Sequence, residues 1–171
     1  RDAWHKPELI VALTPFRALC GFRRRERTVS LLQQLDVPEL AAVRRRLETG
    51  AETAGIRAAF ETLLALPTRE VAEVIAATVS ACARQVDAGG AFAAECAVAL
   101  ALAHEYPGDV GVVSALLLNR VTLHPGEAIY LPAGNLHAYL EGLGVEIMAS
   151  SDNVLRGGLT PKHVDANELV G

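Results

Sequence analysis

The feature that most constrains the fold of this chain is the run from Gly126 to His137, in which glycine, proline and histidine recur at fixed spacing. Five residues separate Gly126 from Pro132, and Gly134 lies three positions before His137. Proline and glycine so placed end one strand in a tight turn and allow a second strand to start at His137. Because imidazole is a preferred ligand of zinc and similar ions, we interpret His137 as a metal ligand rather than as a hydrogen-bonded core histidine.

The composition is that of an ordinary globular protein, with 51% hydrophobic and 21% charged residues in a chain of 171. A net charge of −4 argues against a nucleic-acid partner, and the lack of a long apolar run argues against a membrane span. The three cysteines are too few and too scattered for a disulfide framework, so we expect a cytoplasmic protein. The chain starts at Arg1 without an initiator Met or a signal peptide, and we expect it to be part of a longer protein.

Local patterns divide the chain into strand, helix and strand blocks. An apolar run over 8–13, closed by Pro15, predicts a buried strand, and residues 28–108 predict helices with stripes at three- and four-residue spacing. Asp36 is expected to cap one helix at its N-terminus, and 91–104, apolar nearly all round, is expected to be the most buried helix. Further strands are predicted at 120–123, 127–131, 137–140 and 145–149.

This order predicts an α+β fold in which a helical domain, 28–108, is inserted between two segments of a β-barrel, 1–27 and 109–171. The Gly126 to His137 run matches the second sequence motif of the cupins, although Glu141 stands where that motif has asparagine. The barrel is therefore expected to be a cupin-type jelly roll.

Three segments make the chain resemble the type I mannose-6-phosphate isomerases. They are His5-Lys-Pro-Glu8, Leu131-Pro-Ala-Gly-Asn-Leu-His-Ala-Tyr139 and the long run from Glu146 to Lys162. The resemblance implies interconversion of mannose 6-phosphate and fructose 6-phosphate through an enediol, with zinc as cofactor. It also implies that Glu8 and His137 are zinc ligands, together with a Gln-x-His pair that would lie upstream of Arg1.

Strand alternation places the polar residues of interest on shared faces. Pro7 disfavours a helix at Lys6, so 5–8 is expected to be extended. The pairs on one face are Lys6 with Glu8, His137 with Tyr139, and Glu146 with Met148, whereas His5 lies on the opposite face from Lys6. A polar pocket inside a barrel needs this pattern. The alternatives are a solvent-facing lysine at Lys6 and an edge-strand charge at Glu146.

The resemblance also implies the remaining site residues. Arg156 would be the catalytic arginine, Lys162 would help to bind the phosphate, and Tyr139 would contact substrate. Asp152 would assist ring opening or position Arg156. The residues leave the general base open between Lys6, Glu146 and His5, with Lys6 preferred.

Three other functions stay open at this point. A non-catalytic cupin that binds a sugar phosphate would need no Gln-x-His pair, and a different metal-dependent cupin would use the same barrel. The alanine-rich helices are a less favoured candidate for a protein-interaction module. For the isomerase we expect a monomer with a small-molecule sugar phosphate as its partner, and neither a nucleic acid nor a membrane.

Overall fold

The strand segments on either side of the helices pair with each other to form two antiparallel sheets. The computed structural model describes residues 4–151 and 154–160. One sheet has the strand order β4-β1-β6 and the other β3-β2-β5. The strands are β1 (Glu8–Ala12), β2 (Phe16–Phe22), β3 (Leu118–Leu123), β4 (Ala128–Leu131), β5 (His137–Glu141) and β6 (Gly144–Met148). The predicted α+β class, with helices inserted between strand segments, is confirmed.

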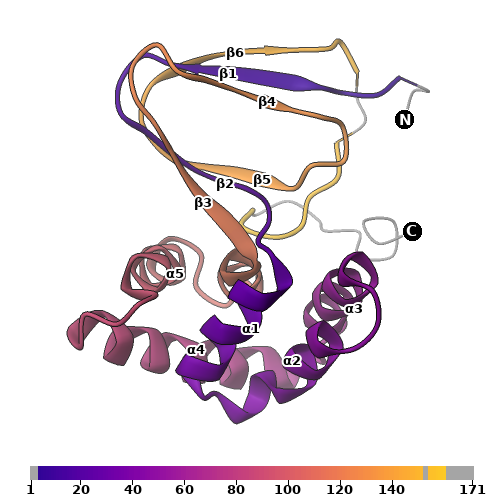
Figure 1. Cartoon of the computed structure of the whole chain (residues 1–171), viewed down its shortest axis with the longest axis vertical. Helices are drawn as coiled ribbons and strands as arrows, with labels where there is room; N and C mark the ends of the chain where they lie inside the picture. The colour runs from indigo at the N-terminus through magenta and orange to yellow at the C-terminus, as the bar shows by residue number, and fades with distance from the viewer. Residues whose placement is uncertain (1–3, 152–153, 161–171) are drawn as a thin grey trace. The chain divides into compact units, whose positions relative to one another are not determined.

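The two sheets face each other, and Figure 1 shows them as the two layers of the strand unit. Their inner faces share an apolar core of Ile10 and Ala12 from β1, Phe16 and Ala18 from β2, and Leu123 from β3. Each of these residues is less than 9% exposed, and burying a large apolar side chain contributes about 1.5–3 kcal/mol. The core therefore fixes which faces of β1 and β2 point inward.

The strand β2 has no counterpart among the strands predicted from the sequence, and it is the central strand of its sheet. The sequence carries only a short signal, because Arg17 stands between the apolar Phe16 and Ala18 while the apolar Leu19 ends the alternation. Pro15, which ends the apolar run of β1, begins a tight connection rather than a long loop. The other five strands are confirmed, with bounds shifted by one or two residues.

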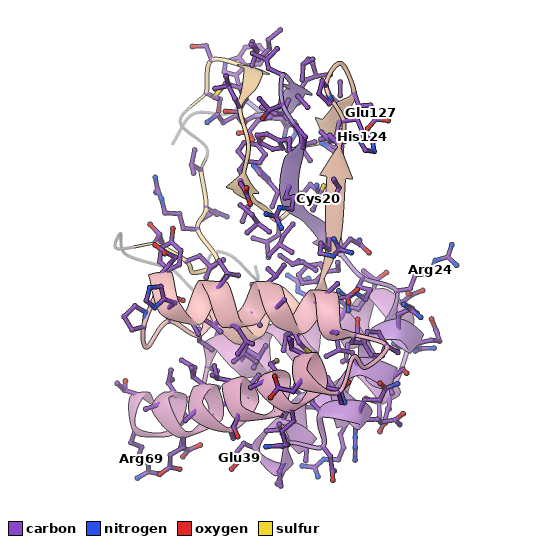
Figure 2. All side chains as sticks on the ribbon, turned by 90° about the vertical axis from the view of Figure 1, so that its left-hand side faces the viewer. Cys20, Arg24, Glu39, Arg69, His124 and Glu127 are labelled. Atoms are coloured by element: carbon purple, nitrogen blue, oxygen red, sulfur yellow. The ribbon has the colours of Figure 1, made fainter. Side chains whose placement is uncertain are left out.

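The turn between β3 and β4 is the one predicted at His124-Pro-Gly126. Gly126 has φ +88°, a left-handed conformation that favours glycine. The carboxylate of Glu127 accepts a hydrogen bond from the backbone N–H of His124 at 2.7 Å. Figure 2 labels both residues at this turn. A local side-chain contact of this kind closes the turn that carries the chain from one sheet to the other.

The second unit consists of helices, and of the described residues it comprises Arg23–Leu117 together with 156–160 by its contacts. Its elements are α1 (Arg25–Leu35), η1 (Pro38–Leu40), α2 (Ala41–Glu48), α3 (Glu52–Leu64), α4 (Thr68–Asp87), α5 (Ala93–Glu105), α6 (Gly111–Ser114) and η2 (Ala115–Leu117). Helical structure thus begins before the predicted 28 and continues beyond 108. No helix in the described part of the chain is long and apolar enough to cross a membrane.

Two expectations about the helices were wrong. Asp36 is the C-cap of α1, not an N-cap: its φ is +48°, and its N–H donates to the carbonyl of Leu32. Aspartate tolerates this left-handed conformation better than most residues, so it also ends helices. The helix α5 buries only Cys96, Ala99 and Leu102, because its many alanines make even its outer face apolar in composition.

Candidate metal centre

The ring of His137 is oriented by the turn that precedes it. Gly134 has φ +80°, and the N–H of Asn135 donates to the carbonyl of Pro132 at 3.1 Å. His137 is the first residue of β5, and its Nδ1 lies 2.9 Å from the carbonyl oxygen of Asn135. Because a carbonyl oxygen only accepts hydrogen bonds, Nδ1 carries the proton and Nε2 is the nitrogen that faces the site.

Glu8 meets His137 from the opposite sheet. Glu8 is the first residue of β1, and its Oε2 lies 2.9 Å from His137 Nε2. Its other oxygen, Oε1, lies 3.5 Å from Lys6 Nζ. The side chains of Glu8 and Lys6 are 13% and 17% exposed, so the carboxylate of Glu8 and the amino group of Lys6 lie close together with little solvent around them.

Glu146 joins these residues from β6, the edge strand next to β1. The register places it opposite Ile10 on the inner face. Its Oε1 accepts a hydrogen bond from the hydroxyl of Tyr139 at 2.5 Å, a contact that joins the two sheets. The Tyr139 ring packs edge-on against Phe16, with centroids 5.3 Å apart and an interplanar angle of 70°. Tyr139 therefore holds Glu146 in one orientation.

Partial burial, followed by the hydrogen bond to Glu146 and its negative charge, raises the pKa of Tyr139 above its usual value. The raised pKa favours the neutral hydroxyl, which is the form that donates to the carboxylate. The Tyr139–Glu146 hydrogen bond is therefore present throughout the neutral pH range.

One ligand-type atom from each of Glu8, His137 and Glu146 lies within 4.8 Å of the other two. One imidazole nitrogen and two carboxylates form a donor set that suits zinc and related divalent ions. The resemblance implies Glu8 and His137 as ligands, and Glu146 is one of the three candidate bases; the structure brings Glu8, His137 and Glu146 together.

The other predicted site residues lie outside this group of three. Lys6 contacts it through Glu8, and Tyr139 through Glu146. His5 is exposed, and Arg156 is half-buried and belongs by its contacts to the helical unit. Asp152 and Lys162 lie outside the described residues.

Comparisons with known proteins show which proteins the chain resembles. No protein-family model matches the chain. The mannose-6-phosphate isomerase of Rattus norvegicus is 39% identical over 98% of the chain, and that of Escherichia coli is 43% identical over 99%. A solved point mutant of phosphomannose isomerase from Salmonella typhimurium superimposes with a TM-score of 0.87 at 40% identity, over 99% of the chain. The chain belongs to the mannose-6-phosphate isomerase family.

A solved zinc-bound mannose 6-phosphate isomerase is similarly close, with a TM-score of 0.86 at 41% identity over 99% of the chain. The chain spans only about two fifths of these relatives, 42% of the rat protein and 41% of the zinc-bound structure. The cupin barrel inferred from the Gly126 to His137 run agrees with this match to the mannose-6-phosphate isomerases. The likeness extends through the strands and the inserted helices alike.

Replacement of Tyr139 by phenylalanine tests its hydrogen bond to Glu146. We expect Tyr139→Phe to lower the free energy of unfolding by about 0.5–1.5 kcal/mol, the usual net contribution of one hydrogen bond. Because the pKa of folded Tyr139 is raised, this contribution is complete below the unfolded pKa of about 10 and decreases as the pH rises above it.

Urea unfolding of the two proteins at several pH values measures this difference. Tyr130→Phe is the matched control, because Tyr130 lies on β4 with 60% of its surface exposed. An equal loss in both variants, or a difference that grows above pH 10, would contradict the role given to Tyr139.

Proposed function

We propose that the protein carrying this chain is a zinc-dependent isomerase that interconverts mannose 6-phosphate and fructose 6-phosphate. The observation that carries the proposal is the convergence of Glu8, His137 and Glu146 on one point in a chain of this family. Their nitrogen and oxygen donors fit zinc. Because a catalytic zinc usually has three protein ligands, the proposal includes the Gln-x-His pair, in residues outside this chain, alongside Glu8 and His137.

The reaction is an internal oxidation and reduction. One proton leaves C2 and one is added at C1, so that the C1 aldehyde is reduced to an alcohol while the C2 alcohol becomes a ketone. Zinc, when bound, supplies Lewis-acid polarisation of the substrate oxygens. The protein must provide a general base for the C2 proton and hold the substrate in the open form.

Two of the three candidate bases are supported by their positions. Lys6 Nζ lies 3.5 Å from Glu8 Oε1, and Glu146 receives the hydroxyl hydrogen bond of Tyr139. A base must be held still to act at a single carbon atom, and each of these contacts restricts the side chain. His5 is exposed and has less support. We retain Lys6 as the preferred base, with Glu146 as the second candidate.

Substrate recognition is proposed from the resemblance. Arg156 would stabilise the negative charge that develops on the enediol, and Lys162 would bind the phosphate. Asp152 would assist ring opening or position Arg156, and Tyr139 would contact the sugar. We place the enzyme in the cytoplasm, because Cys20, Cys82 and Cys96 are all free thiols. We propose that it acts as a monomer.

The test is an isomerase assay on the protein in its natural length, followed by metal removal. We expect turnover of mannose 6-phosphate, with about one zinc per chain by elemental analysis. A chelator should remove most of the activity, and added zinc should restore it. Binding of the sugar phosphate without turnover would instead favour the non-catalytic cupin. Turnover that survives complete metal removal would contradict the proposal.

A further inference from the structure

The strand β2 carries a bulge directly beside the metal centre. The register of β2 against β3 shifts between Leu19 and Phe22, so Cys20 and Gly21 lie outside the regular ladder. Gly21 has φ +64°. The side-chain amide of Asn119, on β3, lies within 3.2 Å of the carbonyl oxygens of Cys20, Gly21 and Phe22. The bulge is therefore held in one conformation from its own sheet.

Asn135, in the turn before His137, rests on this bulge. Its Nδ2 lies 3.2 Å from Cys20 Sγ. Its Oδ1 lies 3.0 Å from the place where a Cβ on Gly21 would stand, so any other residue at Gly21 would push the Asn135 side chain back. The next peptide is fixed too, because the N–H of Gly21 donates to the carbonyl of Leu136 at 2.8 Å.

The same Asn135 determines the orientation of His137. The main-chain carbonyl of Asn135 accepts the proton of His137 Nδ1, as described above. Cys20 and His137 are also direct cross-strand partners in the pairing of β2 with β5. Figure 2 labels Cys20 among the strands. The contact at Cys20 Sγ is therefore connected to the His137 ring through a single residue, Asn135.

We propose that Cys20 and the side chain of Asn135 are a positioning pair that fixes the ring of His137 for metal binding. Neither residue needs to touch the metal or the substrate. The sulfur of Cys20 accepts a hydrogen bond from the side-chain amide of Asn135 and so fixes that residue. With Asn135 fixed, its main-chain carbonyl stays in place to accept the hydrogen bond from His137 Nδ1–H. Loss of a group that orients a ligating histidine typically costs about 10- to 100-fold in metal affinity.

The inference rests on the proposed zinc site but not on isomerase turnover. An alternative explanation is that Cys20 only fills space between the sheets, where a free cysteine behaves as a small apolar residue. The two explanations differ for serine. Serine is a poor apolar filler, but its hydroxyl can accept the hydrogen bond of the Asn135 amide.

The experiment compares Cys20→Ala, Asn135→Ala, their double variant and Cys20→Ser in the protein at its natural length. Zinc affinity is measured by competition with a chromogenic chelator, and cobalt replaces zinc for a ligand-field spectrum. We expect each alanine variant to bind zinc about 10-fold more weakly and the double variant hardly more weakly than either. Cys20→Ser should recover most of the affinity and the parental cobalt spectrum.

Thr122→Ala, at an exposed position of β3, is the matched control and should leave the affinity unchanged. The proposal is overturned if folded Cys20→Ala binds zinc as tightly as the parent, if the two losses add, or if Cys20→Ser behaves as Cys20→Ala. Failure of the proposed function is distinguishable, since it would appear in the parent itself, as zinc binding without isomerase turnover or as no zinc binding.

A second readout needs no metal. The rings of His137 and Tyr139 lie with their centroids 5.4 Å apart, so proton–proton Overhauser contacts between them in the metal-free protein report the orientation of the His137 ring. We expect these contacts in the parent and in Cys20→Ser, and weaker contacts in Cys20→Ala and Asn135→Ala. If the parent binds no zinc, the proposed function fails and these contacts still decide whether the pair orients the ring. Identical contacts in all variants would overturn the inference.

Discussion

A Glu8→Ala variant is expected to purify with almost no zinc, because it removes the residue that brings the two sheets together at the metal centre. Glu8 Oε2 lies 2.9 Å from His137 Nε2, and its side chain is only 13% exposed. A neutral side chain cannot supply the negative charge that the Glu8 carboxylate offers to zinc. We expect zinc affinity to fall by at least about 100-fold, which is the upper end of the effect known for outer-shell partners.

Elemental analysis of the purified variant measures the stoichiometry, and competition with a chelator measures the affinity. Circular dichroism shows whether the variant is folded, since Lys6 loses its ionic partner at the same time. The matched control is Glu141→Ala, at the end of β5, whose carboxylate pairs with Arg17 and is 65% exposed. Unchanged zinc content in folded Glu8→Ala would exclude Glu8 as a ligand.

The metal centre shows what local sequence can predict and where it stops. Alternation along a strand is a local property, so it predicts that Glu146 shares a face with Met148 and that Lys6 shares one with Glu8. The approach of Glu146 to Glu8 depends on β6 pairing with β1, more than a hundred residues away, in the register that puts Glu146 opposite Ile10. Pairing partners and register follow from burial of whole faces, which no short segment encodes.

The surroundings of His137 were missed for a related reason. Cys20 is related to the metal centre only because it is the cross-strand partner of His137. That pairing could not be foreseen, since β2 itself is not predicted from the sequence. The usable signal was the apolar run around Arg17 followed by Gly21, since an isolated glycine in a strand pattern suggests a bulge. In contrast, the Pro132 to Gly134 turn was predictable, because its chemistry is contained within a few residues.

Asp36 shows a different limit of sequence-based prediction, because the local preference of aspartate is compatible with either end of a helix. Aspartate favours the first position of a helix, and it also adopts the left-handed conformation that ends one. The choice was made by Leu31, Leu32 and Leu35, which are buried and extend α1 up to Asp36. Local preference therefore located a helix boundary correctly and assigned it to the wrong helix.

The second large effect is expected from Arg156→Ala, which should lose most of its isomerase turnover and keep its zinc. The resemblance implies that the guanidinium stabilises charge on the reacting sugar. Such a contact is stronger in the transition state than in the ground state, so its loss lowers kcat more than it raises KM. Removing one charge-stabilising donor typically costs about 10²–10³ in kcat.

Zinc retention separates this effect from the one expected for Glu8, since Arg156 belongs by its contacts to the helical unit and not to the strands that carry the three ligand-type residues. Arg156→Lys adds a test of shape, because it keeps the charge and loses the planar two-pronged donor; it should recover only part of kcat. Arg69→Ala, with a side chain 85% exposed on α4, is the control. Full turnover in Arg156→Ala would remove Arg156 from catalysis, whereas loss of zinc together with turnover would make its role structural.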